Sequence, residues 1–518
     1  MRRNASKKHV PVTEEDFYVD ATSKEEQAER WALSDVKKTI GHYMAAFNAY
    51  EQGLNAMDCT EVGSYHIYYN QTRLLLKLHT DYIACDGINI LQYVNISDLG
   101  DGINILQYAN TTDLGNTSPL FLPLDSIIDR FEFAIAKFGD LCSWDLFFNL
   151  LTCYLSFLEE SSSELGGEIL LKIFSRFVEL AQNLIQLHLQ ELETWDVSIE
   201  AKDDDFRSMD LSHQSFDSTT GEGIKASQDA PAAEYVEMQD EITHLTFVET
   251  LTVCFRFVST LMEILFEAAH GKRAGINPVQ SNYLRDAVSQ FKSQLNSFAS
   301  EIDRDKENSE TIELDLAIRF VQGLELAMSA NFDNLQRFIE ESGDDSDNLM
   351  ICVDVLRSCL SNQSLTSLQN WSFCSEIGRL LSRVETGLTQ KRLDIMSGRL
   401  KGIDNELSPT VFKLCDVMIT RSDNELLRWS MKMSEPNNSL DQSASKTSAV
   451  LLKNAEVLLK NATAIAQKPC GFREYVTDKL KRNYIYKQAY ERLEFIKSGK
   501  TTAVTKELAL DHPFFASR

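Results

Sequence analysis

Apolar side chains recur every three or four positions along most of this 518-residue chain, which is the spacing of one face of an α-helix. In residues 34–57, for example, Ile40, Tyr43 and Tyr50 fall on one stripe, and Asp35 is placed to cap the helix at its N-terminus. The alternation of apolar and polar residues that is typical of strands is essentially absent. The pattern predicts an all-α protein.

Breaks in this pattern divide the chain into helical regions, loops and polar segments. The longest break is rich in Ser, Asp and Gly, has few apolar residues and is typical of a disordered acidic linker. The predicted segments are a disordered tail over 1–24, helices over 25–82, a loop insertion over 83–122, helices over 123–195, the acidic linker over 196–236, a C-terminal helical region over 237–500, and a tail over 501–518.

The loop insertion contains an almost perfect direct repeat. Residues 86–100 read DGINILQYVNISDLG, and residues 101–115 repeat them with only a few changes. A period of 15 residues is too short for a solenoid unit, so we interpret the repeat as a duplication tolerated in a surface loop. The two INILQY segments are the one place where short strands are expected.

Composition excludes several classes of protein. The chain has only 9 Pro and 22 Gly residues, which disfavours turn-rich β folds and Gly-rich nucleotide sites. A formal net charge of −26 argues against binding to nucleic acids or to anionic membranes and favours a basic partner. No signal peptide and no membrane span are expected. The ten Cys residues form no C-x-x-C pair, which predicts a reducing compartment.

Two stretches share a spacing of small and aromatic residues. Ala46-x-x-x-Tyr50 recurs as Ala134-x-x-x-Phe138, and each is followed by a helix with an aromatic-Asn pair. This spacing resembles the second helix of tetratricopeptide (TPR) repeats, and the first 80 residues are similar to a group of fungal TPR-like proteins. The resemblance implies an α-solenoid of antiparallel helix pairs, although the 34-residue period is not kept, and another helical array or bundle remains an alternative. The expected repeat positions are Trp31, Tyr43, Ala46, Tyr50, Tyr69, Ala134, Phe138, Trp144 and Phe148.

Local motifs predict no catalytic site, cofactor or metal. Gly499-Lys500-Thr501 has Glu494 where a phosphate-binding loop needs Gly. The nine His residues show no zinc-ligand spacing, and His188 is expected in the core. We therefore expect a protein that is not an enzyme, while an enzyme whose site is invisible in local motifs stays open.

The C-terminal segment 471–500 is basic and rich in Tyr, unlike the rest of the chain. Basic and aromatic residues together are typical of single-stranded RNA binding, whereas Tyr at helical spacing is typical of packing. We favour packing and keep an RNA-associated factor as an alternative. The residues of this possible basic patch are Arg473, Lys479, Lys481, Arg482, Lys487 and Arg492.

Together these observations predict a non-enzymatic scaffold, adaptor or escort chaperone in the cytosol or nucleus. A curved array of helix pairs exposes an extended concave surface, and an acidic surface attracts a basic protein segment. The expected partner is therefore a basic protein.

Overall fold

The computed structural model describes residues 10–85, 88–93, 110–162, 165–207, 242–271, 273, 275–302, 309–362, 365–400, 406–434, 442–471, 474–508 and 512–516. Within these ranges the chain is built from helices, and no strand is formed. The prediction of an all-α fold is therefore confirmed.

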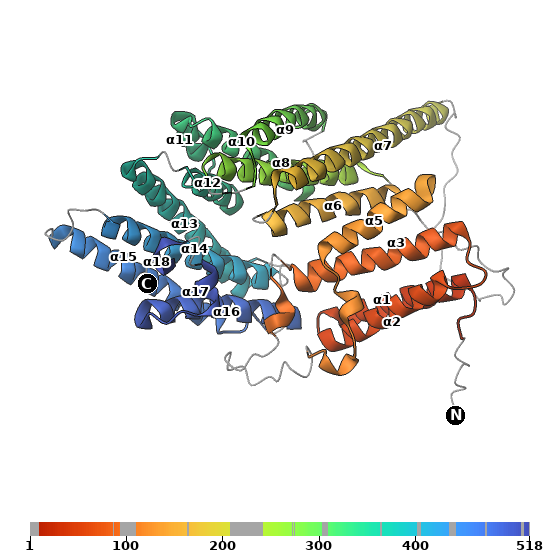
Figure 1. Ribbon diagram of the computed structural model, residues 1–518, viewed down its shortest axis with the longest axis horizontal. Coiled ribbons are helices and arrows are strands. Elements are labelled where there is room, and N and C mark those ends of the chain that lie inside the picture. Colours follow the sequence, from red (N-terminus) through yellow and green to blue (C-terminus); the bar gives the residue numbers. More distant parts are fainter. Residues whose placement is uncertain are drawn as a thin grey trace.

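The helices fall into three consecutive groups along the chain (Figure 1). The N-terminal group comprises α1 (Glu14–Ala32), α2 (Val36–Leu54) and α3 (Glu61–Leu78), which continues as the π-helical turn η1 (His79–Ile83). The middle group comprises α5 (Leu124–Phe138), α6 (Trp144–Ser161), α7 (Gly167–Arg207), α8 (His244–Ala269), α9 (Pro278–Ala299) and α10 (Ser309–Met328). The C-terminal group comprises α11 (Phe332–Glu340), α12 (Ser346–Cys359), α13 (Ser367–Met396), α14 (Leu407–Ser434), α15 (Gln442–Ala466), α16 (Val476–Ser498), α17 (Ala503–Leu508) and α18 (Pro513–Ala516).

Side-chain caps start several of these helices, and the cap of α2 is the predicted one. The Asp35 carboxylate accepts a hydrogen bond from the Lys38 amide at 3.0 Å and caps α2 as expected. Thr13 and Asp16 form a reciprocal capping box at the start of α1, and Thr366 and Gln369 form one at the start of α13. These caps satisfy backbone N–H groups that the first helical turn leaves without partners.

Most helices pack on helices one or two places away in the chain, as α10 does on α8 and α12, so the chain forms a continuous helical array. Long amphipathic helices bury their apolar stripes against one another, and three clusters of buried apolar side chains result. In the middle cluster the rings of Phe177 on α7 and Phe257 on α8 are stacked with centroids 3.6 Å apart. By length and composition α8 alone among the described helices is suited to cross a membrane, and 67% of its apolar window is buried inside the fold.

The C-terminal helix α16 returns to the N-terminal group. Its Val476 amide donates a hydrogen bond to the Leu33 carbonyl at 3.1 Å, and Val476 and Leu480 are buried in the N-terminal apolar cluster. The short 3₁₀ helix η2 (Ile90–Tyr93), from the first repeat copy, also packs on α16 and buries Ile90 completely. The array therefore closes on itself rather than ending in two free caps.

Several predicted boundaries were wrong. Residues 14–24, expected in a disordered tail, belong to α1, because Thr13 caps the helix and Ala21 is fully buried. Residues 501–518 were expected as a tail, yet the described part forms α17 and α18 and buries Phe514 against Trp429 and Phe495.

Two further expectations are only partly covered by the described residues. Helix α7 continues to Arg207, into the predicted acidic linker, whose residues from 208 onward lie outside the described part. The first INILQY segment forms a 3₁₀ helix and not a strand, because Ile90 has to reach the apolar surface of α16. The second INILQY segment lies outside the described residues.

Candidate functional site

A cleft of about 980 Å³ opens on the surface of the C-terminal helices. Helices α13 and α15 form its two walls, and α14, which packs on both, forms its floor. We name it the arginine cleft, because four of its lining residues are arginines. The lining consists of Asp344, Ser375, Gly378, Arg379, Ser382, Arg383, Thr386, Gly387, Arg421, Glu425, Arg428, Thr447, Val450, Leu451 and Asn454.

The wall from α13 is one continuous helix face. Its lining residues are spaced three or four apart from Ser375 to Gly387, which places them on one side of the helix. At 1.5 Å per residue this face extends for about 18 Å. Only the two arginines on it, Arg379 and Arg383, carry long side chains. This wall therefore consists of small or polar residues, from which only the two Arg side chains project.

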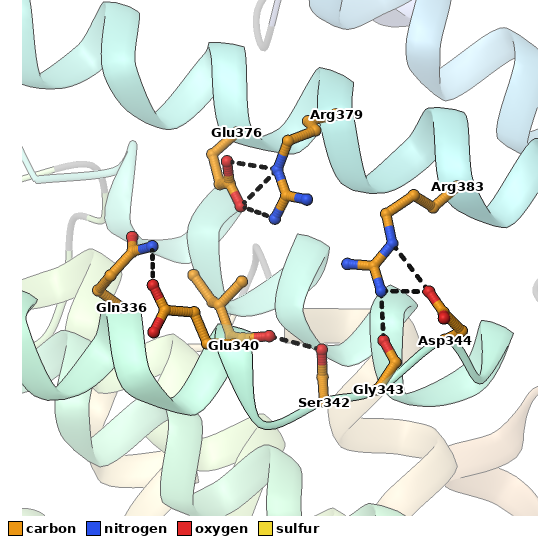
Figure 2. A network of polar contacts seen from close by, with 9 residues as sticks. Gln336, Glu340, Ser342, Gly343, Asp344, Glu376, Arg379 and Arg383 are labelled. Atoms are coloured by element: carbon orange, nitrogen blue, oxygen red, sulfur yellow. Dashed lines mark hydrogen bonds and ion pairs between the residues drawn. The ribbon is translucent and has the colours of Figure 1, made fainter.

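These two arginines are held by carboxylates (Figure 2). The Arg383 Nη2 donates to the Asp344 Oδ1 and to the Gly343 carbonyl, both at 2.5 Å, in the loop between α11 and α12. The Arg379 Nε and Nη2 donate to Glu376 one turn earlier on α13, at 2.5 to 3.1 Å, and this hydrogen bonding raises the pKa of Arg379. Both guanidinium groups are therefore held in place on the wall.

The floor carries the other two arginines on α14. The Arg421 Nη1 donates to the Glu385 Oε2 at 2.6 Å across the α13–α14 interface. The Arg428 Nη1 donates to the Glu425 Oε1 at 3.0 Å, and its guanidinium lies over the Trp371 ring at 4.6 Å. The Arg428 Nε is buried and has no hydrogen-bond partner. The floor therefore holds guanidinium donors that the fold itself does not fully satisfy.

This donor set fits an anionic group. A guanidinium presents five N–H donors, and the fold binds Arg421 and Arg428 through Nη1 alone. Each of the four guanidiniums that line the cleft is paired with one carboxylate, so further acceptors would bind the donors that these ion pairs leave open. The cleft is therefore suited to binding an anionic group.

A glycine sets how closely the floor approaches the wall. A Cβ added at Gly378 would lie 3.3 Å from the Asn424 Nδ2, which donates to the Cys374 carbonyl at 2.9 Å. A larger residue at this position would push α14 away from α13. Gly378 therefore fixes the depth of the arginine cleft.

The predicted repeat positions are mostly interior. Tyr43, Ala46, Tyr50, Tyr69, Ala134 and Phe138 are buried, and Trp144 and Phe148 are half-buried. Trp31 is 39% exposed, so its assignment as a packing position was wrong. It lies near the end of α1, where the Lys38 ammonium of α2 lies over its ring at 3.8 Å.

The predicted basic patch does not form one surface. Arg482 is fully buried and makes a bidentate ion pair with Glu474 at 2.5 and 2.9 Å. Arg492 is also buried and pairs with Asp423 at 3.2 Å. Lys481 lines a second cavity of about 510 Å³ between Ile88, α14 and α16, while Lys479 and Lys487 are half-buried. Arg473 lies outside the described residues.

The remaining polar clusters give no sign of a metal centre in the described part of the chain. Within it no three His, Cys, Asp or Glu side chains converge in the way that a metal ion requires. All ten Cys residues are described and none is in a disulfide.

Comparison with known proteins shows which family shares this fold. Residues 161–329 match the family described as the YNL193W-like protein middle domain, and residues 340–518 match the YNL193W C-terminal domain. A Saccharomyces cerevisiae relative, named "Uncharacterized protein YNL193W", is 34% identical over 556 aligned residues, which cover 98% of this chain and 95% of the relative. The chain belongs to the YNL193W-like family. No solved structure matches it.

The YNL193W-like domains coincide with the packing described above. The gap between the two matched ranges, from residue 329 to residue 340, contains most of α11. It lies close to the boundary between the middle and the C-terminal apolar clusters. The arginine cleft lies entirely within the YNL193W C-terminal domain. The predicted similarity to a group of fungal proteins is therefore confirmed. The assignment to the TPR class stays a prediction.

Sequence reasoning missed the arginine cleft of this YNL193W-like protein. A signal was present, because Arg379 and Arg383 are four apart and Arg421 and Arg428 seven apart, each pair on one helix face. The pairs lie on different helices, and only the packing of α13 on α14 brings them to one cleft.

Proposed function

We propose that this YNL193W-like protein is a non-enzymatic scaffold or adaptor and that the arginine cleft receives an extended segment of a protein partner. The observation that carries the proposal is the shape and lining of the cleft, which is open, about 18 Å long and bordered by hydrogen-bond donors. A strand-like peptide rises about 3.3 Å per residue, so the cleft accommodates five or six residues.

A binding role fits the cleft better than catalysis does. Its serines and threonines have no His or Cys beside them in the lining, and its arginines are held in ion pairs that keep them charged. The RNA alternative is weakened, since Arg482 and Arg492 are buried and paired within the chain. The enzyme alternative would need a site elsewhere.

The predicted basic partner concerns the whole acidic surface and not the arginine cleft. A net charge of −26 favours such a partner at other faces of the molecule. A location in the cytosol or nucleus forms part of the same proposal and is supported by ten cysteines without a disulfide.

The test is to fill the arginine cleft and compare the proteins that co-purify. Ser382→Trp places a large ring in the cleft, whereas Gln390→Trp places the same ring on an exposed position of α13 outside it. Both variants are first checked for an unchanged thermal unfolding midpoint. We expect Ser382→Trp to lose a defined set of partners that Gln390→Trp retains, and equal partner sets for both variants would refute the proposal.

A further inference from the structure

We infer that the occupant of the arginine cleft is an acidic peptide segment, with two carboxylates on one face of the extended chain and an apolar side chain between them. This inference rests on the proposed function and adds the chemistry of the partner.

An acidic side chain of the protein itself shows what Arg383 recognises. Asp344 reaches the Arg383 guanidinium from the loop after α11, although the Asp344 side chain is 93% exposed (Figure 2). An exposed ion pair of this kind contributes little to stability. A partner carboxylate can therefore replace Asp344 at small cost to the fold, so Asp344 is a stand-in for the ligand at one end of the cleft.

The floor arginines set the spacing of further carboxylates. Arg421 and Arg428 are seven residues apart on α14, which corresponds to about 10.5 Å along the helix. The fold binds each of these two arginines through Nη1 alone, so each keeps an Nη2 group for a carboxylate of the partner. In an extended peptide, side chains two or four positions apart point to the same face, so carboxylates with that spacing can face both arginines.

The wall from α15 supplies the apolar contact. Val450 and Leu451 line the cleft there, and Val450 is 57% exposed. An apolar side chain between the two acidic positions would cover Val450 and remove it from water. A nucleic acid strand offers no aliphatic side chain for this contact. We therefore assign the cleft to a peptide.

The experiment measures fluorescence anisotropy of labelled peptides with the full chain. The probe is the hexapeptide Glu-Glu-Ser-Leu-Glu-Glu carrying an N-terminal fluorescein. Its matched controls replace every Glu with Gln or with Lys, and a labelled oligouridine decamer tests for nucleic acid. We expect binding of the Glu peptide alone, and its Kd should rise between 50 and 300 mM salt as the charges are screened.

Variants of a single ion pair separate recognition from folding. Arg421→Gln and Glu385→Gln break the same ion pair, but only Arg421→Gln removes a guanidinium from the cleft. We expect Arg421→Gln to weaken binding of the Glu peptide at least about tenfold, because it removes charge-assisted hydrogen bonds. Glu385→Gln, and Arg285→Gln on the exposed face of α9, should leave the Kd within about twofold of the unmodified protein's value.

Each outcome decides one question. Equal weakening by Arg421→Gln and Glu385→Gln, tighter binding of the Gln, Lys or oligouridine probe, or no binding of the Glu peptide would overturn the inference. If another peptide binds and Ser382→Trp abolishes that binding, the acidic class is wrong while the proposed function stands. If Ser382→Trp changes neither peptide binding nor the partner set, the proposed function fails as well.

Discussion

The side chain of His188 on α7 makes the stability of the middle helices depend on pH. It is fully buried, and neither ring nitrogen has a hydrogen-bond partner. Its neighbours are aromatic, with the Trp144 ring centroid at 5.4 Å and the Phe247 centroid at 6.3 Å. Burial lowers the pKa of His188 from 6.5 to about 4, because the charged imidazolium would lose its hydration there.

The sign and size of the effect follow from linkage. Because the pKa is lower in the folded than in the unfolded chain, acid protonates the unfolded chain first, and stability falls as the pH drops below about 6.5. With pKa values of 6.5 and about 4, the loss is about 1.4 kcal/mol at pH 5.5 and approaches about 3.4 kcal/mol below pH 4. Above pH 7.5 this group contributes almost nothing to the pH dependence.

Replacing His188 by Phe tests this reasoning. The variant keeps an aromatic ring in the site and removes the group that titrates, so its free energy of unfolding should fall by about 1.4 kcal/mol less than that of the unmodified protein between pH 7.5 and 5.5. Urea denaturation followed by Trp fluorescence measures this difference. His244→Phe, at the exposed start of α8, serves as the control and should retain the pH dependence of the unmodified protein. An unchanged pH dependence in His188→Phe would refute the assigned pKa.

Three further predictions concern buried groups. Arg482→Met should cost about 3 to 5 kcal/mol by urea denaturation, because it leaves the Glu474 carboxylate buried without its partner, and adding Glu474→Gln should recover part of that loss. Burial raises the pKa of Glu263 to about 7, so the contribution of this group to stability falls as the pH rises from about 4.5 to 7. Glu263→Gln should therefore raise the thermal unfolding midpoint more at pH 8 than at pH 5. Leu480→Asp should expose the contact between α16 and the N-terminal helices to limited proteolysis, whereas the exposed Lys497→Asp should not.

The sequence predicts the helices well where their apolar stripes are long. The stripe of Ile40, Tyr43 and Tyr50 on α2 and the cap at Asp35 both appear as expected, because they depend on contacts within one helix or one hairpin. Trp31 fits the same local pattern but is exposed, since a spacing rule does not reveal which helix covers a given face. The spacing of apolar residues therefore identifies a helix but does not show which other helices pack against it.

The arginine cleft and the role of the basic segment depend on such neighbours. The charges of α16 are compatible with an RNA-binding surface until Glu474 and Asp423 are seen to pair with Arg482 and Arg492 in the interior. The opposite holds for Arg421, whose isolated charge on α14 says little until α13 and α15 border it. In both cases the helix that packs beside a charged residue determines its role. The periodicity of the sequence does not identify that helix.

The packing of the array explains why the arginines of α16 are buried and those of α13 and α14 are accessible. Helix α16 buries Leu480 among N-terminal side chains and buries Arg482 within the C-terminal group, so its opposite faces are covered by both ends of the chain. Because Arg482 and Arg492 are buried in this way, they are not available to a partner. The arginines of α13 and α14 differ because α15 stands apart from α13 and leaves the floor between them open to solvent. In the arginine cleft, accessible cations therefore lie where a gap in the packing coincides with an incomplete set of hydrogen-bond partners.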